Sequence, residues 1–473
     1  MTKKAEPKQI HLNLFEMNCV SHITHGMWVH PENTRHRFNE LRFWTELAEL
    51  LEYGTFDAMF LADVTGVYDG FRDSATTSVI EGMQIPSNDP LMVIPAMAAV
   101  TEHLGFAATF STTYEPPFSF ARRMSTLDHL TGGRVGWNVV TSYLPNAARN
   151  FGYDDEVEHD NRYERADEYL DVVYKLWEGS WEDDAVLVDR DHRIYADPEK
   201  VHYINHVGQY YKVAGPHLCE PSPQRTPVIF QAGVSDAGRR FAGKHAEAIF
   251  IGGGTIEAVK FFVEDIRRIG EEWGRAPEDI KFFPGVNVIV GRDDDEIQRK
   301  VDDYQRLRSV EGYLAHSSSR IDLTRYPRSE RIDAIVASGV DGSAALERFG
   351  TDRTVGDVLD NLGALNRPFS VIGTAKVVAD QLEEWVDQTG IDGFNLIQHL
   401  TPGTALDVIE LVIPELRKRG RYRESYDDAP TLRERLSGRG QARLKSTHPG
   451  ARYRDPATLK SGALLVPADQ HGA

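Results

Sequence analysis

His159 and Tyr163 stand four residues apart, where a long polar loop gives way to a helical sequence pattern. Residues four apart lie on one face of a helix, so this imidazole and phenol would lie beside the exposed N–H groups of the first turn. Those N–H groups and the positive end of the helix dipole favour an anion. The pair therefore indicates a phosphate site, although a capped helix with a packed tyrosine would give the same pattern.

Two predicted strands end in polar residues that could bind the rest of such a ligand. The apolar run RVGWNVV contains Asn138 and leads into Thr141 and Ser142. A polar ring at this strand end and a phosphate at the helix would suit one long ligand. The run PVIFQAG is followed by Ser235, directly before a helix, where the hydroxyl could cap the helix or bind an anion. Beside a first phosphate-binding pair, we favour the anion.

Short apolar runs alternate with longer amphipathic ones along the chain, a pattern typical of βα units around a parallel sheet. Near-continuous apolarity predicts strands that are buried on both faces. One intervening helix is predicted over residues 41–53, where Gly54 ends the apolar stripe. The predicted strands number eight, which favours a (β/α)8 TIM barrel over an open sheet; they are IHLNLF, AMFLAD, GFAATFS, RVGWNVV, PVIFQAG, EAIFIGG, KFFPGVNVIVG and GFNLIQHL.

Ligands bind at the C-terminal ends of strands in barrels and in open α/β sheets alike. The first strand ends at Met17 and Cys19, and the second ends at Asp63. The third strand carries Thr109 near its end, followed by Ser111. We therefore expect these side chains to surround the same site as Asn138 and Ser142.

Composition limits the class of protein. The 473 residues are 41% hydrophobic and 10% aromatic, which is typical of a globular protein with a large core. A formal charge of −19 disfavours binding to nucleic acid or to anionic membranes. The sequence contains two cysteines, no long apolar run and no signal-sequence pattern. These features favour a cytoplasmic protein without membrane insertion.

We expect residues 1–420 to form the barrel and residues 421–473 to form a C-terminal arm. Within the barrel, residues 179–224 and about 293–368 do not fit a minimal (β/α)8 pattern. Long insertions at such positions usually cover a site, so the second insertion is predicted to be an active-site lid. The basic, proline-containing C-terminal arm could wrap a neighbouring subunit or be mobile, and we favour the former.

Several other chemistries lack their usual sequence signals. His22 and His25 have a possible metal-ligand spacing, but no zinc motif accompanies them, and we expect His25 to order a loop. No GxSxG elbow, P-loop or GxGxxG dinucleotide motif occurs. A hydrolase that pairs Asp63 with Glu16 remains conceivable, but it would leave the phosphate site unexplained.

The motifs FLAD, STTYEPP, SFARRMSTLDHLTGGRVGWNVVTS, EHDNRY and FQAGVSDAGRRFAGKHAE occur along the chain. They resemble those of the bacterial-luciferase-like flavin monooxygenases. The specific branch is the group of nitrilotriacetate, dibenzothiophene-sulfone and long-chain alkane monooxygenases, and the chain is most similar to the alkane-oxidising members. The resemblance covers roughly residues 10–422. The likeness to the alkane branch is carried by FEMNCV, GPHLCEPSPQRTP and LAH.

The resemblance implies an FMN-binding barrel in which reduced flavin (FMNH2) reacts with O2 to give a C4a-hydroperoxide that oxygenates the substrate. It places the isoalloxazine and ribityl chain against Asp63, Thr109, Asn138 and Ser142. It places the phosphate against His159, Tyr163 and Ser235. Because the chain has no dinucleotide motif of its own, a separate NAD(P)H:flavin reductase is the expected partner. We expect a homodimer or a homotetramer.

The substrate pocket is predicted from both the resemblance and the strand ends. Its expected residues are Met17, Cys19, Tyr68, Gln84, Tyr143 and His316. Among them we consider Cys19, Tyr68, Tyr143 and His316 as catalytic candidates. His316 is the best candidate to hydrogen-bond the distal peroxide or to donate a proton, because the unperturbed pKa of histidine lies near working pH. Cys19 fits an apolar wall better than a nucleophile. Tyr143 departs from the alkane branch, which has histidine there.

Apolar side chains at the strand ends favour an apolar substrate. The leading hypothesis is terminal hydroxylation of a long-chain alkane to a primary alcohol. The same chemistry on a sulfone, an aminopolycarboxylate or a halogenated aromatic is a first alternative, and a carboxylate-rich substrate would need several Arg or Lys. The second alternative is a deazaflavin-dependent reductase of the same fold, or a flavin-binding protein without catalysis.

Overall fold

The computed structural model describes residues 7–154, 159–252, 254–317, 321–338, 350, 352–363, 365 and 369–461. For residues 159, 160, 460 and 461 it describes the backbone only. No helix in these ranges is long and apolar enough to span a bilayer.

Eight parallel strands form a closed barrel, and the β10–β11 and β13–β1 pairings complete the ring. The predicted (β/α)8 fold is confirmed, with every predicted strand in place. In ring order the strands are β1 (His11–Met17), β2 (Ala58–Ala62), β3 (Gly105–Ser111), β4 (Val135–Val140), β9 (Val228–Ala232), β10 (Ala248–Ile251), β11 (Lys281–Gly291) and β13 (Gly393–Ile397).

Aromatic rings fill the inside of the barrel. Phe60 of β2 lies 5.6 Å from both Phe15 and Phe230, measured between ring centroids, and 5.8 Å from Phe250. These rings belong to one buried apolar cluster. Because the interior is packed, the polar chemistry of the strands is left to their ends.

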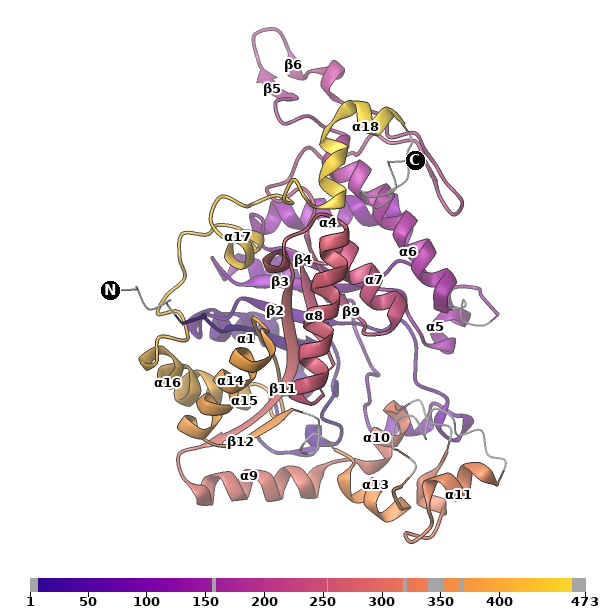
Figure 1. The fold of residues 1–473 in the computed structure, drawn as a ribbon, viewed down its shortest axis with the longest axis vertical. Helices are drawn as coiled ribbons and strands as arrows, with labels where there is room; N and C mark the ends of the chain where they lie inside the picture. Colours follow the sequence, from indigo (N-terminus) through magenta and orange to yellow (C-terminus); the bar gives the residue numbers. More distant parts are fainter. Residues whose placement is uncertain are drawn as a thin grey trace.

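Helices surround the strands (Figure 1). Helix α1 has the predicted bounds, buries Trp44, Leu47 and Leu51 against the barrel, and ends at Gly54. The helices around the barrel range from 5 to 17 residues in length. They are α1 (Leu41–Tyr53), α2 (Thr76–Ile80), α3 (Ile94–Ala99), α4 (Pro117–Thr131), α5 (Pro145–Asn150), α6 (His159–Tyr174), α7 (Asp236–His245), α8 (Ile256–Glu272), α14 (Ala375–Thr389), α15 (Gly403–Asp407) and α16 (Ile413–Lys418).

One strand of the sheet was not predicted. Strand β12 (Ser370–Thr374) pairs only with the last five residues of the long strand β11, from Asn287 to Gly291. It therefore lies beside the ring instead of within it. Residues 179–224 contain two further short hairpins, β5 (Val186–Asp189) with β6 (Ile194–Ala196) and β7 (His206–Val207) with β8 (Lys212–Val213).

The described part of the second insertion is helical. Its helices gather at one end of the molecule in Figure 1; they are α9 (Asp294–Leu307), α10 (Val310–His316), α11 (Ile332–Ala337) and α13 (Val355–Asn361). Leu314 and Ile332 of this insertion share a buried apolar cluster with Tyr68 and Leu144, which follow β2 and β4. The insertion thus packs on loops at the C-terminal ends of the strands. Its action as a lid stays a prediction.

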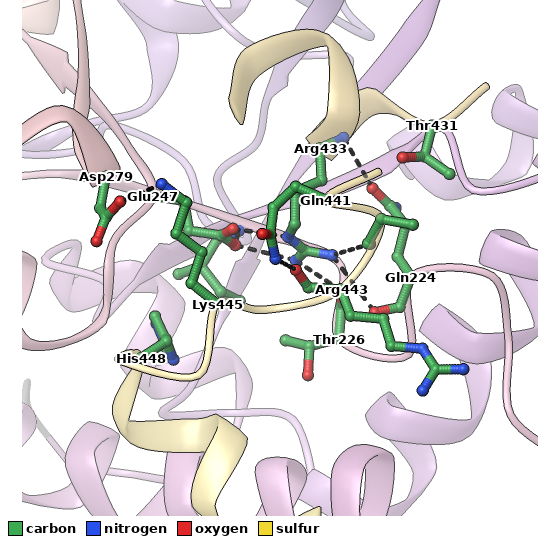
Figure 2. A network of polar contacts seen from close by, with 12 residues as sticks. Gln224, Thr226, Glu247, Asp279, Thr431, Arg433, Gln441, Arg443, Lys445 and His448 are labelled. Carbon is green, nitrogen blue, oxygen red and sulfur yellow. Dashed lines mark hydrogen bonds and ion pairs between the residues drawn. The ribbon is translucent and has the colours of Figure 1, made fainter. Parts of the chain in front are cut away.

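The C-terminal strap, defined as residues 421–461, lies against the barrel of its own chain. It contains α17 (Leu432–Ser437) and α18 (Pro456–Ser461). Leu432 and Leu436 of α17 belong to the same apolar cluster as the rings inside the barrel. Figure 2 shows Arg433 of the strap bonded to Glu247 and Gln224 of the barrel. A contact with a neighbouring subunit stays a prediction, and residues 462–473 lie outside the described part.

Candidate functional site

A cavity of about 320 Å³ opens where β2, β3, β4 and β9 end. Loops after these strands and the start of α6 supply its wall. The lining residues are Asp63, Val64, Thr65, Thr109, Phe110, Ser111, Tyr114, Glu115, Val139, Val140, Thr141, Ser142, Tyr143, Leu144, Ala147, Phe151, Arg162, Tyr163, Gln231, Ala232 and Phe241. The structure thus brings together Asp63, Thr109, Ser142, Tyr143 and Tyr163, as the sequence predicted.

Two buried amide oxygens at the strand ends have no hydrogen-bond partner among the described residues. Asn138 donates from Nδ2 to Thr109 Oγ1 at 2.9 Å, which leaves its Oδ1 unpaired. Gln231 on β9 likewise has an unpaired Oε1. Buried acceptors are normally satisfied, so such a pair indicates a ligand that donates from N–H groups. Ser142 lies nearby and donates to Ser111 Oγ at 2.8 Å.

The start of α7 and the phenol of Tyr163 lie side by side. Ser235 caps α7 and accepts from the N–H of Gly238 at 3.2 Å. A Cβ atom added at Gly238 would lie 3.0 Å from the Tyr163 hydroxyl oxygen, and one added at Gly233 would lie 3.1 Å from it. Glycine therefore keeps this helix start open beside the phenol, as an anion site requires. The side chain of His159 lies outside the described residues.

Desolvation at the cavity wall raises the pKa of the Asp63 carboxyl to about 8, and the negative charge of Asp89 adds to the rise. The carboxyl of Asp63 is therefore mostly protonated near pH 7 and can donate a hydrogen bond. An aspartate in an unfolded chain has a pKa of about 3.9. Between these two values the folded protein binds a proton that the unfolded chain does not bind.

This difference in proton binding predicts a pH effect on stability. The contribution of Asp63 makes the folded state less stable as pH rises from about 4 to 8. The Asp63→Asn variant lacks this loss, so its free energy of unfolding should increase relative to the parent by up to about 1.4 kcal/mol per pH unit in that interval. Urea denaturation of both proteins between pH 4 and 9 measures the difference. An equal difference at pH 5 and pH 8 would contradict the raised pKa.

Four of the predicted pocket residues form a connected polar cluster next to the cavity. The hydroxyl groups of Tyr68 and Tyr143 are hydrogen bonded to each other, and Tyr143 lines the cavity. The Tyr68 ring lies 5.0 Å from the His316 ring. Gln84 Nε2 lies 3.3 Å from Nε2 of His316. His316 therefore reaches the cavity wall through the two tyrosines.

His25 completes this cluster, which the sequence did not reveal. Its Nε2 lies 2.9 Å from Nδ1 of His316, and its Nδ1 lies 3.2 Å from Ser21 Oγ. We expected His25 to order a loop. The two histidines are 291 residues apart, so no local spacing could have paired them.

Cys19 and Met17 are both buried. Cys19 lies on the loop after β1, in a bridge to Ser87. Desolvation raises the pKa of its thiol to about 12, so the sulfur stays protonated at neutral pH. A protonated thiol is a poor nucleophile, which agrees with an apolar wall.

Glu16 is already committed to other partners. Arg35 donates to its carboxylate, and Gln398 Nε2 donates to its Oε1 at 2.5 Å. Glu16 is fully buried at the end of β1 in this ion pair. A carboxylate held in this way is not available to pair with Asp63, so the geometry disfavours the hydrolase alternative. Among the residues that the structure places, no group of three or more His, Cys, Asp or Glu could hold a metal.

The sequence profile described as "Luciferase-like monooxygenase" matches residues 16–393. The chain belongs to this family. The luciferase-like monooxygenases that resemble it include the long-chain alkane monooxygenase of Geobacillus thermodenitrificans (strain NG80-2), 55% identical over 452 residues, which are 95% of this chain and 98% of the relative. The dimethyl-sulfide monooxygenase of Hyphomicrobium sulfonivorans is 48% identical over 455 residues, 95% of this chain and 94% of that protein.

Solved structures of luciferase-like proteins agree with the barrel. A crystal structure of long-chain alkane monooxygenase matches with a TM-score of 0.88 over 94% of this chain and 100% of the other. A riboflavin lyase with modified FMN and the substrate riboflavin matches with a TM-score of 0.85 and 39% identity, over 94% of this chain and 100% of that one. Membership of the family therefore makes this chain a flavin-dependent monooxygenase.

Proposed function

We propose that this protein is the oxygenase of a two-component system. It takes FMN reduced by a separate NAD(P)H:flavin reductase, uses O2, and oxygenates an apolar substrate. The substrate that fits best is a long-chain alkane, hydroxylated at its terminal carbon. The observation that carries the proposal is the pair of buried, unpaired amide oxygens of Asn138 and Gln231, which lie near a glycine-lined helix start beside Tyr163.

The donors and acceptors at the cavity wall and directly behind it fit FMN. Asn138 does not line the cavity but bonds to Thr109, which does. Oδ1 of Asn138 and Oε1 of Gln231 would accept from N–H groups of the isoalloxazine. Tyr163, Ser235 and the α7 N-terminus would hold the phosphate. Reduced FMN, when bound, supplies the electrons that activate O2. The protonated carboxyl of Asp63 would donate to an acceptor of the ligand.

The apolar wall of the cavity supports an apolar substrate. Val64, Leu144 and Phe151 line it, and the Tyr114 ring stacks on Phe151 at 4.5 Å between centroids. Arg162 is the one Arg or Lys among the lining residues, whereas an aminopolycarboxylate would need several. The relatives' names support an alkane or a small sulfide. Apolar walls also exclude water, which would otherwise consume the activated oxygen unproductively.

The two-component proposal predicts a clear dependence on a second protein. Purified protein with NADH, FMN and O2 should form no product from hexadecane, and an unrelated flavin reductase should restore turnover. The reason is that the chain carries no dinucleotide motif, while reduced FMN can diffuse between proteins. Product is measured by mass spectrometry, with dimethyl sulfide and dibenzothiophene sulfone as parallel substrates. Rapid oxidation of NADH by this protein alone would contradict the proposal.

The phosphate site predicts a specific loss of FMN affinity. Tyr163→Phe and Ser235→Ala should each weaken FMN binding by about 1–3 kcal/mol, the scale of a hydrogen bond to a charged group. Riboflavin, which lacks the phosphate, should bind both variants as it binds the parent. Fluorescence titration with both flavins measures this. If the double variant binds FMN like the parent, the phosphate lies elsewhere.

The proposal also includes a lid over the site and an oligomeric state. The second insertion, residues 293–368, would act as a lid, since its described helices pack on the loops that follow β2 and β4. The protein would work as a homodimer or homotetramer. A deazaflavin-dependent reductase remains the alternative of another class, and oxygen consumption with enzymatically reduced FMN distinguishes the two.

A further inference from the structure

The amide of Gln84 has a fixed orientation. Its Nε2 donates to the backbone carbonyl of His22 at 3.0 Å. A carbonyl oxygen only accepts, so the amide atom that faces it must be the nitrogen. Rotating the amide would bring two oxygens together. The backbone N–H of Gln84 also donates to Ser21 O at 2.9 Å, which holds the residue in place.

This orientation assigns the proton on each ring of the histidine pair. The same Gln84 Nε2 lies 3.3 Å from His316 Nε2 and can only donate, so Nε2 of His316 must accept. A neutral His316 then carries its proton on Nδ1 and donates to Nε2 of His25 at 2.9 Å. His25 in turn carries its proton on Nδ1, which donates to Ser21 Oγ at 3.2 Å. The tautomer of one ring nitrogen is thus set by the bond that the other makes.

His25 also fixes where His316 lies. Its carbonyl oxygen accepts from Ser309 N at 2.9 Å at the start of α10, and its ring meets His316 at the last residue of α10. The next residue, Gly26, has a φ of 89°, and a Cβ there would come within 2.4 Å of Ser309 N. The ring of His25 is fully buried between these elements. One residue of the β1 loop therefore holds both ends of the insertion helix.

We infer that His25 is a positioning residue, which holds His316 as the Nδ1–H tautomer so that Nε2 of His316 is the atom that takes up a proton and then donates it during turnover. His25 acts through His316 and has no place among the cavity-lining residues. The importance of this tautomer for catalysis rests on the proposed function. The tautomer itself does not, so it can be tested without turnover.

The direct test is ¹⁵N NMR of histidine-labelled protein, in which the His316 signals are assigned by comparison with His316→Asn. The parent should show protonated Nδ1 and unprotonated Nε2 in His316. His25→Phe keeps a ring of similar size but offers no acceptor to the Nδ1–H group of His316. The Gln84 amide still favours the parental tautomer, so the form of His316 with its proton on Nε2 should become populated beside the parental one. His25→Gln can place an amide oxygen where Nε2 was, so it should restore the parental tautomer.

The result is then compared with turnover in the reductase-coupled assay. His25→Phe should lower kcat by about tenfold or more with KM nearly unchanged, and His25→Gln should recover most of the loss. A parental His316 with its proton on Nε2, or a tautomer that His25→Phe leaves unchanged, overturns the inference. So does equal turnover of parent and His25→Phe. If His25→Phe does not fold, Ser21→Ala, which removes the partner of His25 Nδ1, replaces it in both measurements. If neither the parent nor the variants form product but the NMR result is as expected, the proposed function fails and the tautomer assignment stands.

Discussion

The Arg433→Ala variant is expected to have a free energy of unfolding lower than the parent by about 3–5 kcal/mol, the usual loss when one partner of a buried ion pair is removed. Arg433 is 1% exposed. It donates to Glu247 Oε1 at 2.6 Å and Oε2 at 3.0 Å, and to the backbone oxygens of Thr226 and Ala442 at 2.8 Å (Figure 2). Without the guanidinium, a buried carboxylate and several carbonyl groups lose their partner.

A matched control lies in the same C-terminal strap. Arg439 pairs with Asp428, and both side chains are mostly exposed. Exposed pairs contribute about 0–1 kcal/mol, so Arg439→Ala should unfold almost as the parent does. Guanidinium denaturation followed by circular dichroism measures both. Equal stability of the two variants would show that the Arg433 contacts are not needed to hold the strap.

The strap matters for the site because it closes the barrel at the end opposite the cavity. Leu432 inserts where β3 begins, and a Cβ at Gly105 would come within 2.7 Å of it. Arg435 donates to the carbonyl of Asp57 at 2.9 Å, just before β2. Since Asp63 and Thr109 lie at the other ends of β2 and β3, a loosened strap should also disturb the proposed flavin site. Loss of stability and loss of FMN affinity should therefore accompany each other in strap variants.

The barrel was predictable because its signal is local. Each of its strands is a short run of apolar residues, and burial on both faces requires that pattern at every strand. Strand β12 carries the weaker sequence SVIGT and pairs with β11 alone, so nothing in its own residues distinguishes it from a loop. The basic, proline-containing sequence of the strap predicts an arm. It could not indicate the ion pair of Arg433, because Glu247 is 186 residues away.

The contacts of the site also divide into those that the sequence could predict and those that it could not. Tyr163 and Ser235 could be predicted to meet, because each begins a helix that follows a barrel strand and such helix starts gather at one end of the barrel. The Asn138–Thr109 contact follows from adjacent parallel strands, which put these residues in register. The contact between His25 and His316 could not be predicted, because it depends on the path of a long insertion back to the β1 loop.

The position of His316 leads to the second large effect. His316→Ala should lower the product formed per reduced FMN oxidised by about 10²-fold or more, the scale for loss of a group that transfers a proton. Its Nε2 lies against Gln84, and the Tyr68–Tyr143 hydrogen bond joins its ring to the cavity wall. Oxygen consumption should continue in the variant, with hydrogen peroxide replacing the oxygenated product, because His316 is not among the residues proposed to bind the flavin.

The measurement compares product, oxygen and peroxide in the same reductase-coupled reaction. His192→Ala is the control, since this histidine lies on the exposed turn of the β5–β6 hairpin and its side chain is 76% exposed. It should couple oxygen to product as the parent does. If His316→Ala couples normally as well, the insertion that carries His316 has no part in the chemistry, and its proposed action as a lid fails with it. If only His316→Ala produces peroxide, a residue of the insertion takes part in the reaction, because the rest of the barrel is unchanged in both variants.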